Sequence, residues 1–254
     1  MNENVKRIWI TGSSSGIGKA LAIKFAKNGW KVAASARREN LLQELSKGNP
    51  NIFSFPLDVK NELSTKNVFK NIIEKFKNVD ICVFCTGIHD PQSEKTLSSE
   101  KIREIMETNF FGTLNCIMAV NNFFREKKSG HISIVSSVAG YRGLPAASGY
   151  CASKSALTSL AESLYFDFNR HNVRISLISP GFIKTPMTDK NKFPMPMIKS
   201  AEFAAEKIFT GLTKKNAFEI HFPIVFTFMM KFLKIMPNWL YFLLIKKGMK
   251  AVKY

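Results

Sequence analysis

Short apolar stretches rich in β-branched residues alternate with longer stretches of helical spacing, and this alternation constrains the fold more than any other feature of the chain. Repeated strand-then-helix units predict a parallel sheet with helices on both faces. The strand-like stretches are residues 5–11, 30–36, 51–55, 79–85, 130–136 and 173–179, and helical spacing follows at 16–28, 39–47, 62–77, 98–106, 110–127 and 153–170. No linker, repeat or low-complexity tract divides them. We therefore expect an α/β fold, a Rossmann-like doubly wound parallel sheet that forms a single domain over residues 1–221. A chain of 254 residues is of a normal size for one such domain.

A glycine- and serine-rich loop lies where the first strand meets the first helix. Glycines there let the backbone turn tightly and approach a pyrophosphate, whose charge is met by the N–H groups of the helix N-terminus. An ordinary glycine-serine turn is the alternative, but the position at the first strand–helix junction favours a dinucleotide site. The residues expected to contact the cofactor here are Gly12, Ser14, Ser15, Gly16, Ile17 and Gly18.

Further motifs match a known family. The three residues between Gly12 and Gly16 resemble the loop of the short-chain dehydrogenase/reductase family, and Tyr150-x-x-x-Lys154 resembles its second signature. Ser137 lies 13 residues before the tyrosine, as in that family, and Asn109 resembles its helix asparagine. The resemblance covers about residues 5–187. It implies an oxidoreductase that moves a hydride between a nicotinamide and a CH-OH or C=O carbon, with Asn109, Ser137, Tyr150 and Lys154 as catalytic residues.

The chemistry explains these residue types. Carbonyl reduction needs a proton donor that works near neutral pH, and a free tyrosine, with a pKa of about 10, is a poor one. Lys154 lies one helical turn after Tyr150, so its ammonium is expected to depress the pKa of Tyr150. Ser137 is expected to hydrogen-bond the substrate oxygen. By resemblance, Asn109 is expected to hold a water that relays protons to Lys154. A solvated Tyr–Lys pair and a serine turn are the alternatives for each motif taken alone.

Cofactor choice is expected to depend on the end of the second strand. Ala36 stands where an NAD enzyme of the family has an acid, and Arg37 follows it, which favours the phosphate of NADP(H) over NAD. Arg37 and Arg38 opening a surface helix is the alternative. The family's Asn-Asn-Ala-Gly is replaced by Phe84-Cys85-Thr86-Gly87, which keeps only the glycine. Further cofactor contacts implied by the resemblance are Asp58, Val59, Gly87, Tyr150, Lys154, Pro180, Gly181, Ile183 and Thr185.

The chain is basic, and half of its net charge lies near its C-terminus. There are 37 Lys and Arg against 19 Asp and Glu, a net charge of +18, of which residues 184–254 contribute 13 Lys and four acids, or +9. The extension at 222–254 mixes lysines with apolar residues in charge-free runs of 11 residues at most, too short to span a bilayer. We expect it to lie on a membrane surface, to roof the substrate pocket or to contact another subunit. No nucleic-acid motif accompanies the charge, so a nucleic-acid partner is not expected.

The remaining expectations concern partners and location. The four cysteines lie in apolar runs, so core or pocket-wall positions are favoured over a metal or disulfide role, and no metal is expected. The N-terminus leaves no room for a cleavable signal, which favours a cytoplasmic protein with the option of peripheral membrane contact. We expect a hydrophobic aldehyde, ketone or hydroxy compound as substrate. A homodimer or homotetramer is implied by resemblance. The alternative function is a non-catalytic, dinucleotide-responsive binding protein.

Overall fold

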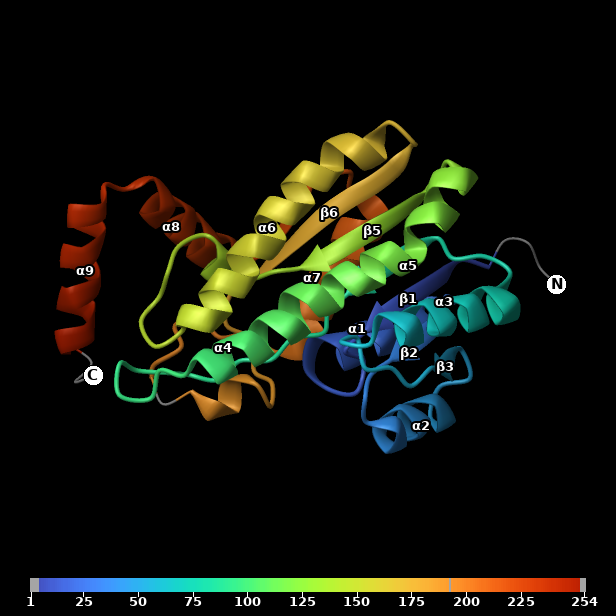
Figure 1. Cartoon of the computed structure of the whole chain (residues 1–254), viewed down its shortest axis with the longest axis horizontal. Helices are drawn as coiled ribbons and strands as arrows, with labels where there is room; N and C mark the ends of the chain where they lie inside the picture. The colour runs from blue at the N-terminus through green and yellow to red at the C-terminus, as the bar shows by residue number, and fades with distance from the viewer. Residues whose placement is uncertain (1–4, 192, 252–254) are drawn as a thin grey trace.

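The computed structural model describes residues 5–191 and 193–251, and its centre is one parallel sheet (Figure 1). The spatial order of the strands is β3-β2-β1-β4-β5-β6-β7, and every neighbouring pair is parallel. The strands are β1 (Arg7–Thr11), β2 (Lys31–Ser35), β3 (Ile52–Ser54), β4 (Ile81–Phe84), β5 (Gly130–Val135), β6 (Val173–Pro180) and β7 (Glu219–Phe222). The predicted doubly wound α/β fold is confirmed.

Helices cover both faces of the sheet, as expected when each parallel strand is followed by a crossover. In Figure 1, α3, α5 and α6 lie in front of the sheet, and α1 and α7 lie behind it. The helices are α1 (Gly16–Lys27), α2 (Glu39–Lys47), α3 (Glu62–Phe76), α4 (Ser99–Met106), α5 (Gly112–Lys127), α6 (Ser148–Asn169), α7 (Ala201–Lys214), α8 (Ile224–Ile235) and α9 (Asn238–Ala251). A π-helical turn, η1 (Glu107–Phe111), joins α4 to α5, and short 3-10 turns occur at η2 (Val138–Gly140) and η3 (Thr188–Lys190).

Two apolar layers hold the helices to the sheet. Residues of α1, α2 and α7, such as Phe25, Leu42 and Ile208, pack on one face, and residues of α3, α5 and α6 pack on the other. Trp9 of β1 lies fully buried in the second layer, with its ring centroid 5.5 Å from that of Phe69 and its Nε1 donating to Ser35 Oγ at 2.9 Å. The indole therefore buries a large apolar surface while its one polar atom is satisfied.

Two predicted boundaries are wrong, and both concern the site. The helix expected at 153–170 begins at Ser148, so Tyr150 and Lys154 both lie in α6. The small residues Ser148 and Gly149 give no apolar periodicity, and the chain enters the helix through Ala146, whose φ is 54°. The helices expected at 98–106 and 110–127 are joined by the π turn η1, which carries Asn109. A π turn inserts an extra residue into a helix and commonly marks a functional position.

Strand order determines where a ligand can bind. β1 pairs with β2 on one side and with β4 on the other, so the chain reverses its direction of progress across the sheet at this point. In open α/β sheets the loops that leave the carboxyl ends of such strands diverge and form a crevice. The loops after β1, β2, β4, β5 and β6 all leave the same edge of the sheet, because the strands are parallel.

Candidate active site

A cavity of about 680 Å³ lies at the carboxyl edge of the sheet. It is lined by loops that follow β1 to β6 and by the first turns of α6. All of the predicted cofactor contacts and three of the four predicted catalytic residues line it, namely Gly12, Ser14, Ser15, Gly16, Ile17, Gly18, Arg37, Asp58, Val59, Gly87, Ser137, Tyr150, Lys154, Pro180, Gly181, Ile183 and Thr185. The exception is Asn109, which is buried beside the cavity.

The glycine-rich loop is shaped so that side chains cannot replace its glycines. Gly12 has φ of +70°, and a Cβ there would lie 2.9 Å from the Cys85 carbonyl oxygen. A Cβ on Gly18 would lie 2.4 Å from the Gly12 carbonyl oxygen, which is far inside van der Waals contact. The loop therefore packs backbone against backbone and leaves the N-terminus of α1 open to the cavity. This cradle fits a pyrophosphate, since N–H groups and the helix dipole can meet its charge.

Arg38, in the loop after β2, packs directly against the glycine-rich loop. Arg38 donates from Nη2 to Ser14 Oγ at 2.8 Å and to Ser15 Oγ at 2.7 Å, and from Nε to Ser14 Oγ at 3.2 Å. Arg37 also lines the cavity. The Arg38 guanidinium thus lies where the loop after β2 meets the glycine-rich loop, and Arg37 lines the same cavity, so two arginines are available to a phosphate bound there. The sequence placed this role on Arg37 and left Arg38 secondary.

Three predicted catalytic side chains, those of Ser137, Tyr150 and Lys154, come together at the carboxyl end of β5 and the first turns of α6. Burial raises the pKa of Tyr150 to about 12, and a hydrogen bond from Ser137 acts against that shift. Burial lowers the pKa of Lys154 to about 8. Lys154 Nζ lies 5.6 Å from the centre of the Tyr150 ring and donates to the Val135 carbonyl oxygen at 2.9 Å. The expectation that Lys154 depresses the pKa of Tyr150 is therefore not met in this structure, because desolvation is the larger effect and the ammonium is hydrogen-bonded elsewhere.

Asn109 supports the cavity wall through hydrogen bonds to neighbouring residues. Its Oδ1 accepts from Ile88 N at 2.7 Å, and its Nδ2 donates to the Ile88 carbonyl oxygen at 3.0 Å and to Ser153 Oγ at 2.9 Å. A Cβ on Gly87 would lie 3.4 Å from Asn109 Oδ1 and 3.5 Å from Lys154 Nζ. The amide thus ties the loop after β4 to α6 beside Lys154. Both Nδ2 hydrogens are used for this, whereas Oδ1 accepts one hydrogen bond and has a second lone pair. The water relay expected at Asn109 stays a prediction.

The loop after β4 keeps its course without the family's asparagines. Thr11 Oγ1 accepts from Cys85 N at 3.1 Å and from Thr86 N at 3.3 Å, so a hydroxyl from β1 anchors the loop backbone. Cys82 is buried in β4, and Cys85 lines the cavity, in agreement with core and pocket-wall positions. Burial raises the pKa of the Cys85 thiol to about 11, which keeps it a neutral wall group.

Several lining residues carried no sequence signal. His89 lies with its ring centroid 4.7 Å from that of Tyr150, and Lys190 lines the same region. Burial lowers the pKa of His89, the charge of Asp90 opposes this shift and the charge of Lys190 adds to it, so the neutral imidazole is favoured. Ile88 and Met187 supply apolar wall beside them. In the sequence, only the position of His89, two residues after Gly87, could have pointed to it. Lys190 lies in the turn η3, where no site residue was predicted from the sequence.

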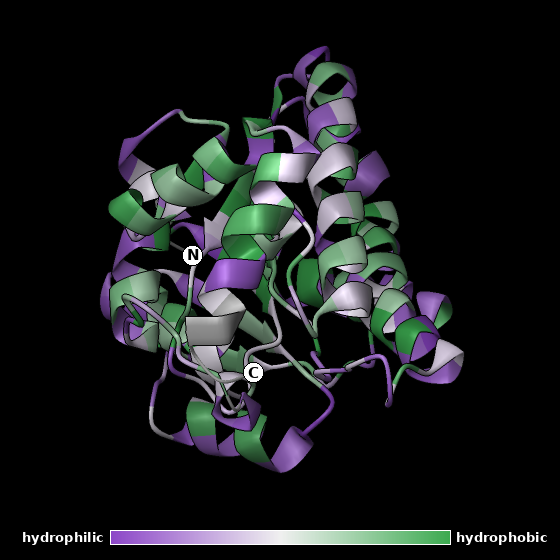
Figure 2. Ribbon diagram, turned by 90° about the vertical axis from the view of Figure 1, so that its left-hand side faces the viewer, coloured by the Kyte–Doolittle hydropathy of each residue, from purple (hydrophilic) through white to green (hydrophobic). Residues whose placement is uncertain are grey.

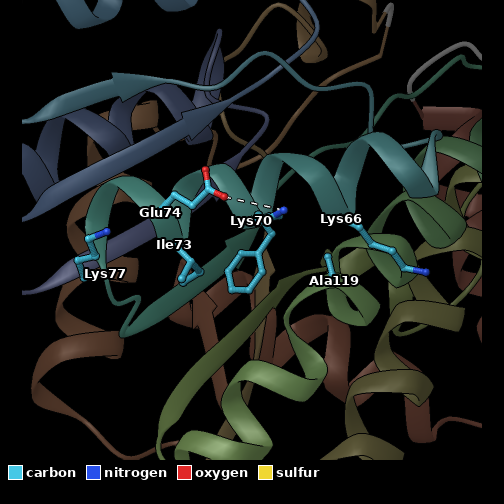
Figure 3. Close-up of a pocket in the computed structure, with 7 residues that line it drawn as sticks. Lys66, Lys70, Ile73, Glu74, Lys77 and Ala119 are labelled. Carbon is cyan, nitrogen blue, oxygen red and sulfur yellow. Dashed lines mark ion pairs between the residues drawn. The ribbon is translucent and has the colours of Figure 1, made fainter.

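A second depression lies between α3 and α5 (Figure 3) and has none of these features. It is lined by lysines and apolar side chains of the α3 region and by Ala119 of α5, and Lys70 Nζ and Glu74 Oε1 on α3 are 4.0 Å apart. No loop from the carboxyl edge of the sheet reaches it. Among residues 5–191 and 193–251, no group of three or more His, Cys, Asp or Glu side chains could hold a metal ion. The cavity at the sheet edge is therefore the candidate active site.

Comparison with known proteins agrees with this geometry. The family model for short chain dehydrogenases matches residues 6–194. An uncharacterized oxidoreductase of Myxococcus xanthus is 34% identical over 236 residues, covering 91% of this chain and 93% of that one. The structure of ElxO with NADP bound superposes with a TM-score of 0.77 at 25% identity, covering 85% of this chain and 97% of that one. A short chain dehydrogenase/reductase of Burkholderia phymatum in complex with NAD gives 0.82 at 21% identity, covering 91% and 93%. The chain belongs to the short-chain dehydrogenase/reductase family of oxidoreductases.

Proposed function

We propose that the protein is an NADP(H)-dependent oxidoreductase that interconverts a carbonyl and an alcohol on a hydrophobic substrate. The observation that carries this proposal is the convergence of Ser137, Tyr150 and Lys154 on one cavity that also contains the glycine-rich loop. A non-catalytic, dinucleotide-responsive protein has no need for a buried lysine, whose charge is costly to desolvate. The intact triad therefore favours an enzyme over a binding module.

The residues of the chain divide the work of reduction between them. A nicotinamide cofactor held in the cavity would supply a hydride to the carbonyl carbon. Ser137 positions the substrate oxygen by a hydrogen bond, and Tyr150 delivers a proton to that oxygen as it gains charge. The Lys154 ammonium, with Nζ 5.6 Å from the centre of the Tyr150 ring, offsets part of the desolvation cost of the phenolate that forms during this transfer, and the reverse transfers apply to alcohol oxidation. Asn109 acts as a positioning residue, because its hydrogen bonds hold the loop at Ile88 against α6.

The two arginines support the preference for NADP(H). Arg37 lines the cavity, Arg38 bonds the serines of the glycine-rich loop, and the residue at the end of β2 that would be acidic in an NAD enzyme is Ala36. Planar guanidinium groups suit a phosphate monoester, and no carboxylate at Ala36 repels it. ElxO binds NADP and the Burkholderia protein binds NAD, so the proposed preference for NADP(H) rests on the two arginines.

The cavity wall bears on the substrate. Ile88, Pro186 and Met187 provide apolar surface in the wall of the cavity that Tyr150 also lines, which suits a hydrophobic carbonyl compound. The described residues of α8 and α9 do not line the cavity, so the wall and not a C-terminal roof supports this proposal. His89 and Lys190 add polar groups near the wall, so a substrate with one further hydrogen-bonding or anionic group also fits.

A homo-oligomer remains our proposal for assembly. α5 and α6 carry exposed apolar side chains, including Met118 at 50% and Phe166 at 68% exposure, on the helices that pair subunits in this family. Burying such side chains against a second copy removes apolar surface from water. Size-exclusion chromatography with light scattering of Met118→Ser/Phe166→Ser tests this pairing.

The decisive test of the reaction is the Tyr150→Phe variant, which removes one hydroxyl and keeps the ring. We expect turnover of NADPH with carbonyl compounds of graded chain length to fall by at least about 1,000-fold, while NADPH still binds. Binding is followed by nicotinamide fluorescence and turnover by NADPH oxidation. Undiminished turnover of a substrate that the parent enzyme reduces would refute the mechanism.

A further inference from the structure

The outer surfaces of α8 and α9 expose large apolar side chains at a density seen on few other helices of this chain. On α8 the exposed residues recur with helical spacing on one side, and on α9 they form a second stripe. They are Ile224, Val225, Phe228, Met229, Phe232 and Ile235 on α8, and Trp239, Phe242, Leu243 and Leu244 on α9, with exposures from 43% to 78%. We call these ten residues the C-terminal apolar face. Figure 2 looks at the end of the molecule that carries α9, where green ribbon gives way to purple towards the label C.

This face belongs to a fixed part of the fold. On its inner side, α8 buries Phe226 and Met230 against Tyr141 and Phe182, and the ring centroids of Phe226 and Phe182 are 5.4 Å apart. Lys231 Nζ lies 2.6 Å from Glu219 Oε2 of β7. α8 is therefore held to the domain by both apolar and ionic contacts. Its outer side stays mostly exposed, and the Phe228 ring there also contacts His221, with 5.6 Å between the ring centroids.

Arg142 fixes the turn between the two helices. Its Nη1 donates to the carbonyl oxygens of Leu233, Lys234 and Met236 at 3.0, 3.0 and 2.7 Å, which satisfies the free carbonyls at the C-terminus of α8. Its guanidinium carbon lies 4.2 Å from the centre of the Tyr241 ring, the buried ring of α9. The Tyr241 hydroxyl donates to the Gly143 carbonyl oxygen. The contacts of Arg142 and Tyr241 thus hold α9 in a fixed orientation, with its apolar stripe already exposed.

The charge of the segment selects among possible partners. Residues 223–254 contain six Lys and no acid. Lys246 and Lys247 are exposed, and Lys246 follows Trp239 and Leu243 on the same stripe of α9. A symmetric contact with a second copy would bring this lysine-rich surface against itself, because a two-fold interface uses the same patch on both subunits. An anionic lipid surface offers apolar depth to the exposed side chains and negative charge to the lysines.

We propose that the C-terminal apolar face docks the protein onto anionic membrane surfaces, with the helices lying in the interface. Among the residues that the structure describes, no helix is long and apolar enough to cross a membrane. In-plane binding needs no such length, because only one side of each helix is buried among the headgroups. The proposal is independent of the reaction assigned to the cavity.

The test is binding of the full-length protein to vesicles of phosphatidylcholine alone and of phosphatidylcholine with phosphatidylglycerol, measured by sedimentation. We expect at least about tenfold tighter partitioning onto the anionic vesicles. The Phe242→Ser/Leu243→Ser and Lys246→Glu/Lys247→Glu variants should each lose at least about tenfold of that partitioning. Because Trp9 and Trp30 are buried and Trp239 is 70% exposed, a blue shift of tryptophan emission should accompany binding and vanish in Trp239→Phe.

Matched controls separate this face from the generally basic surface. Leu63→Ser removes an apolar side chain that is 73% exposed on α3, and Lys70→Glu/Lys77→Glu reverses one exposed lysine on α3 and one at its C-cap. Both should leave partitioning within about twofold of the parent. The proposal is overturned by equal binding to both vesicle types or by equal losses in the α3 and α9 variants. A reduced oligomer size in Phe242→Ser/Leu243→Ser with unchanged vesicle binding would likewise overturn it and assign the face to a second copy.

Discussion

Gly140 offers a way to disturb catalysis without touching a catalytic side chain. It lies in η2, directly against α6, and a Cβ at this position would lie 2.8 Å from the Lys154 carbonyl oxygen and 2.9 Å from both Ser136 Oγ and Thr158 Oγ1. Ordinary contact begins near 3.4 Å, so η2 would have to move by about 0.5 Å away from α6 at two points and away from the Ser136 side chain, just after β5, at a third. That movement draws Ser137 away from Tyr150. We expect Gly140→Ala to lower kcat by about tenfold or more, because reacting groups lose alignment over such distances.

The same variant should also lose stability, by about 1–3 kcal/mol in the free energy of unfolding, as is usual when a well-packed contact is overfilled. The matched control is Gly143→Ala, three residues further along the chain, where an added Cβ meets no atom within 4 Å. Both variants are assayed by NADPH oxidation with a carbonyl compound that the parent enzyme reduces, by NADPH titration and by urea unfolding. NADPH affinity should stay within about threefold of that of the parent, since the glycine-rich loop follows β1 and lies away from Gly140, which follows β5. Equal kcat for the two variants would refute the packing argument.

Two other predictions concern charge at the site. Arg37→Ala and Arg38→Ala should each raise the KM for NADPH by about tenfold or more while leaving that for NADH nearly unchanged, since each removes a charge-assisted contact to a phosphate; equal effects on both cofactors would contradict the cofactor preference. Burial holds the pKa of Lys154 at about 8, so its ammonium is present below that pH and lost above it. We therefore expect kcat/KM for reduction to fall as the pH rises through about 8, and Lys154→Met to abolish that fall together with most of the activity; a parent profile that is flat through this range would contradict the role of the ammonium.

The strands and the chemistry-bearing loops were predictable because they depend on local patterns. Apolar strand stretches at regular intervals require a parallel sheet, and parallel strands deliver their following loops to one edge. Gly12, Ser137 and Tyr150 therefore share a cavity although they are far apart in the sequence. Backbone geometry adds a second constraint, since the close approach of Gly18 to Gly12 excludes any side chain. Local periodicity together with spacing between motifs was sufficient for this part of the site.

The errors lie where tertiary contacts decide. Nothing in the residues around Ser148 announces the start of a helix, because its first turn is small and polar and is stabilised by packing against α4. The use of Arg38, and not Arg37 alone, depends on the positions of two serine hydroxyls across a loop. The pKa of Tyr150 depends on the balance between desolvation and a lysine whose ammonium is bonded to Val135. Such balances are three-dimensional properties, and residue types alone do not reveal their sign.

The C-terminal segment shows why periodicity alone could not distinguish a pocket roof from an exposed surface. The residues of α8 that face inwards, Phe226 and Met230, are of the same chemical kind as Phe228 and Phe232, which face outwards. A helix that is apolar on both sides carries no sequence record of which side is covered. Packing against Tyr141 and Phe182 uses one side, and the described residues of α8 do not line the cavity, so the remaining side stays mostly exposed. Keeping large side chains in water there is unfavourable unless a partner covers them, which is why the charge around them, and not their hydrophobicity, identifies the partner.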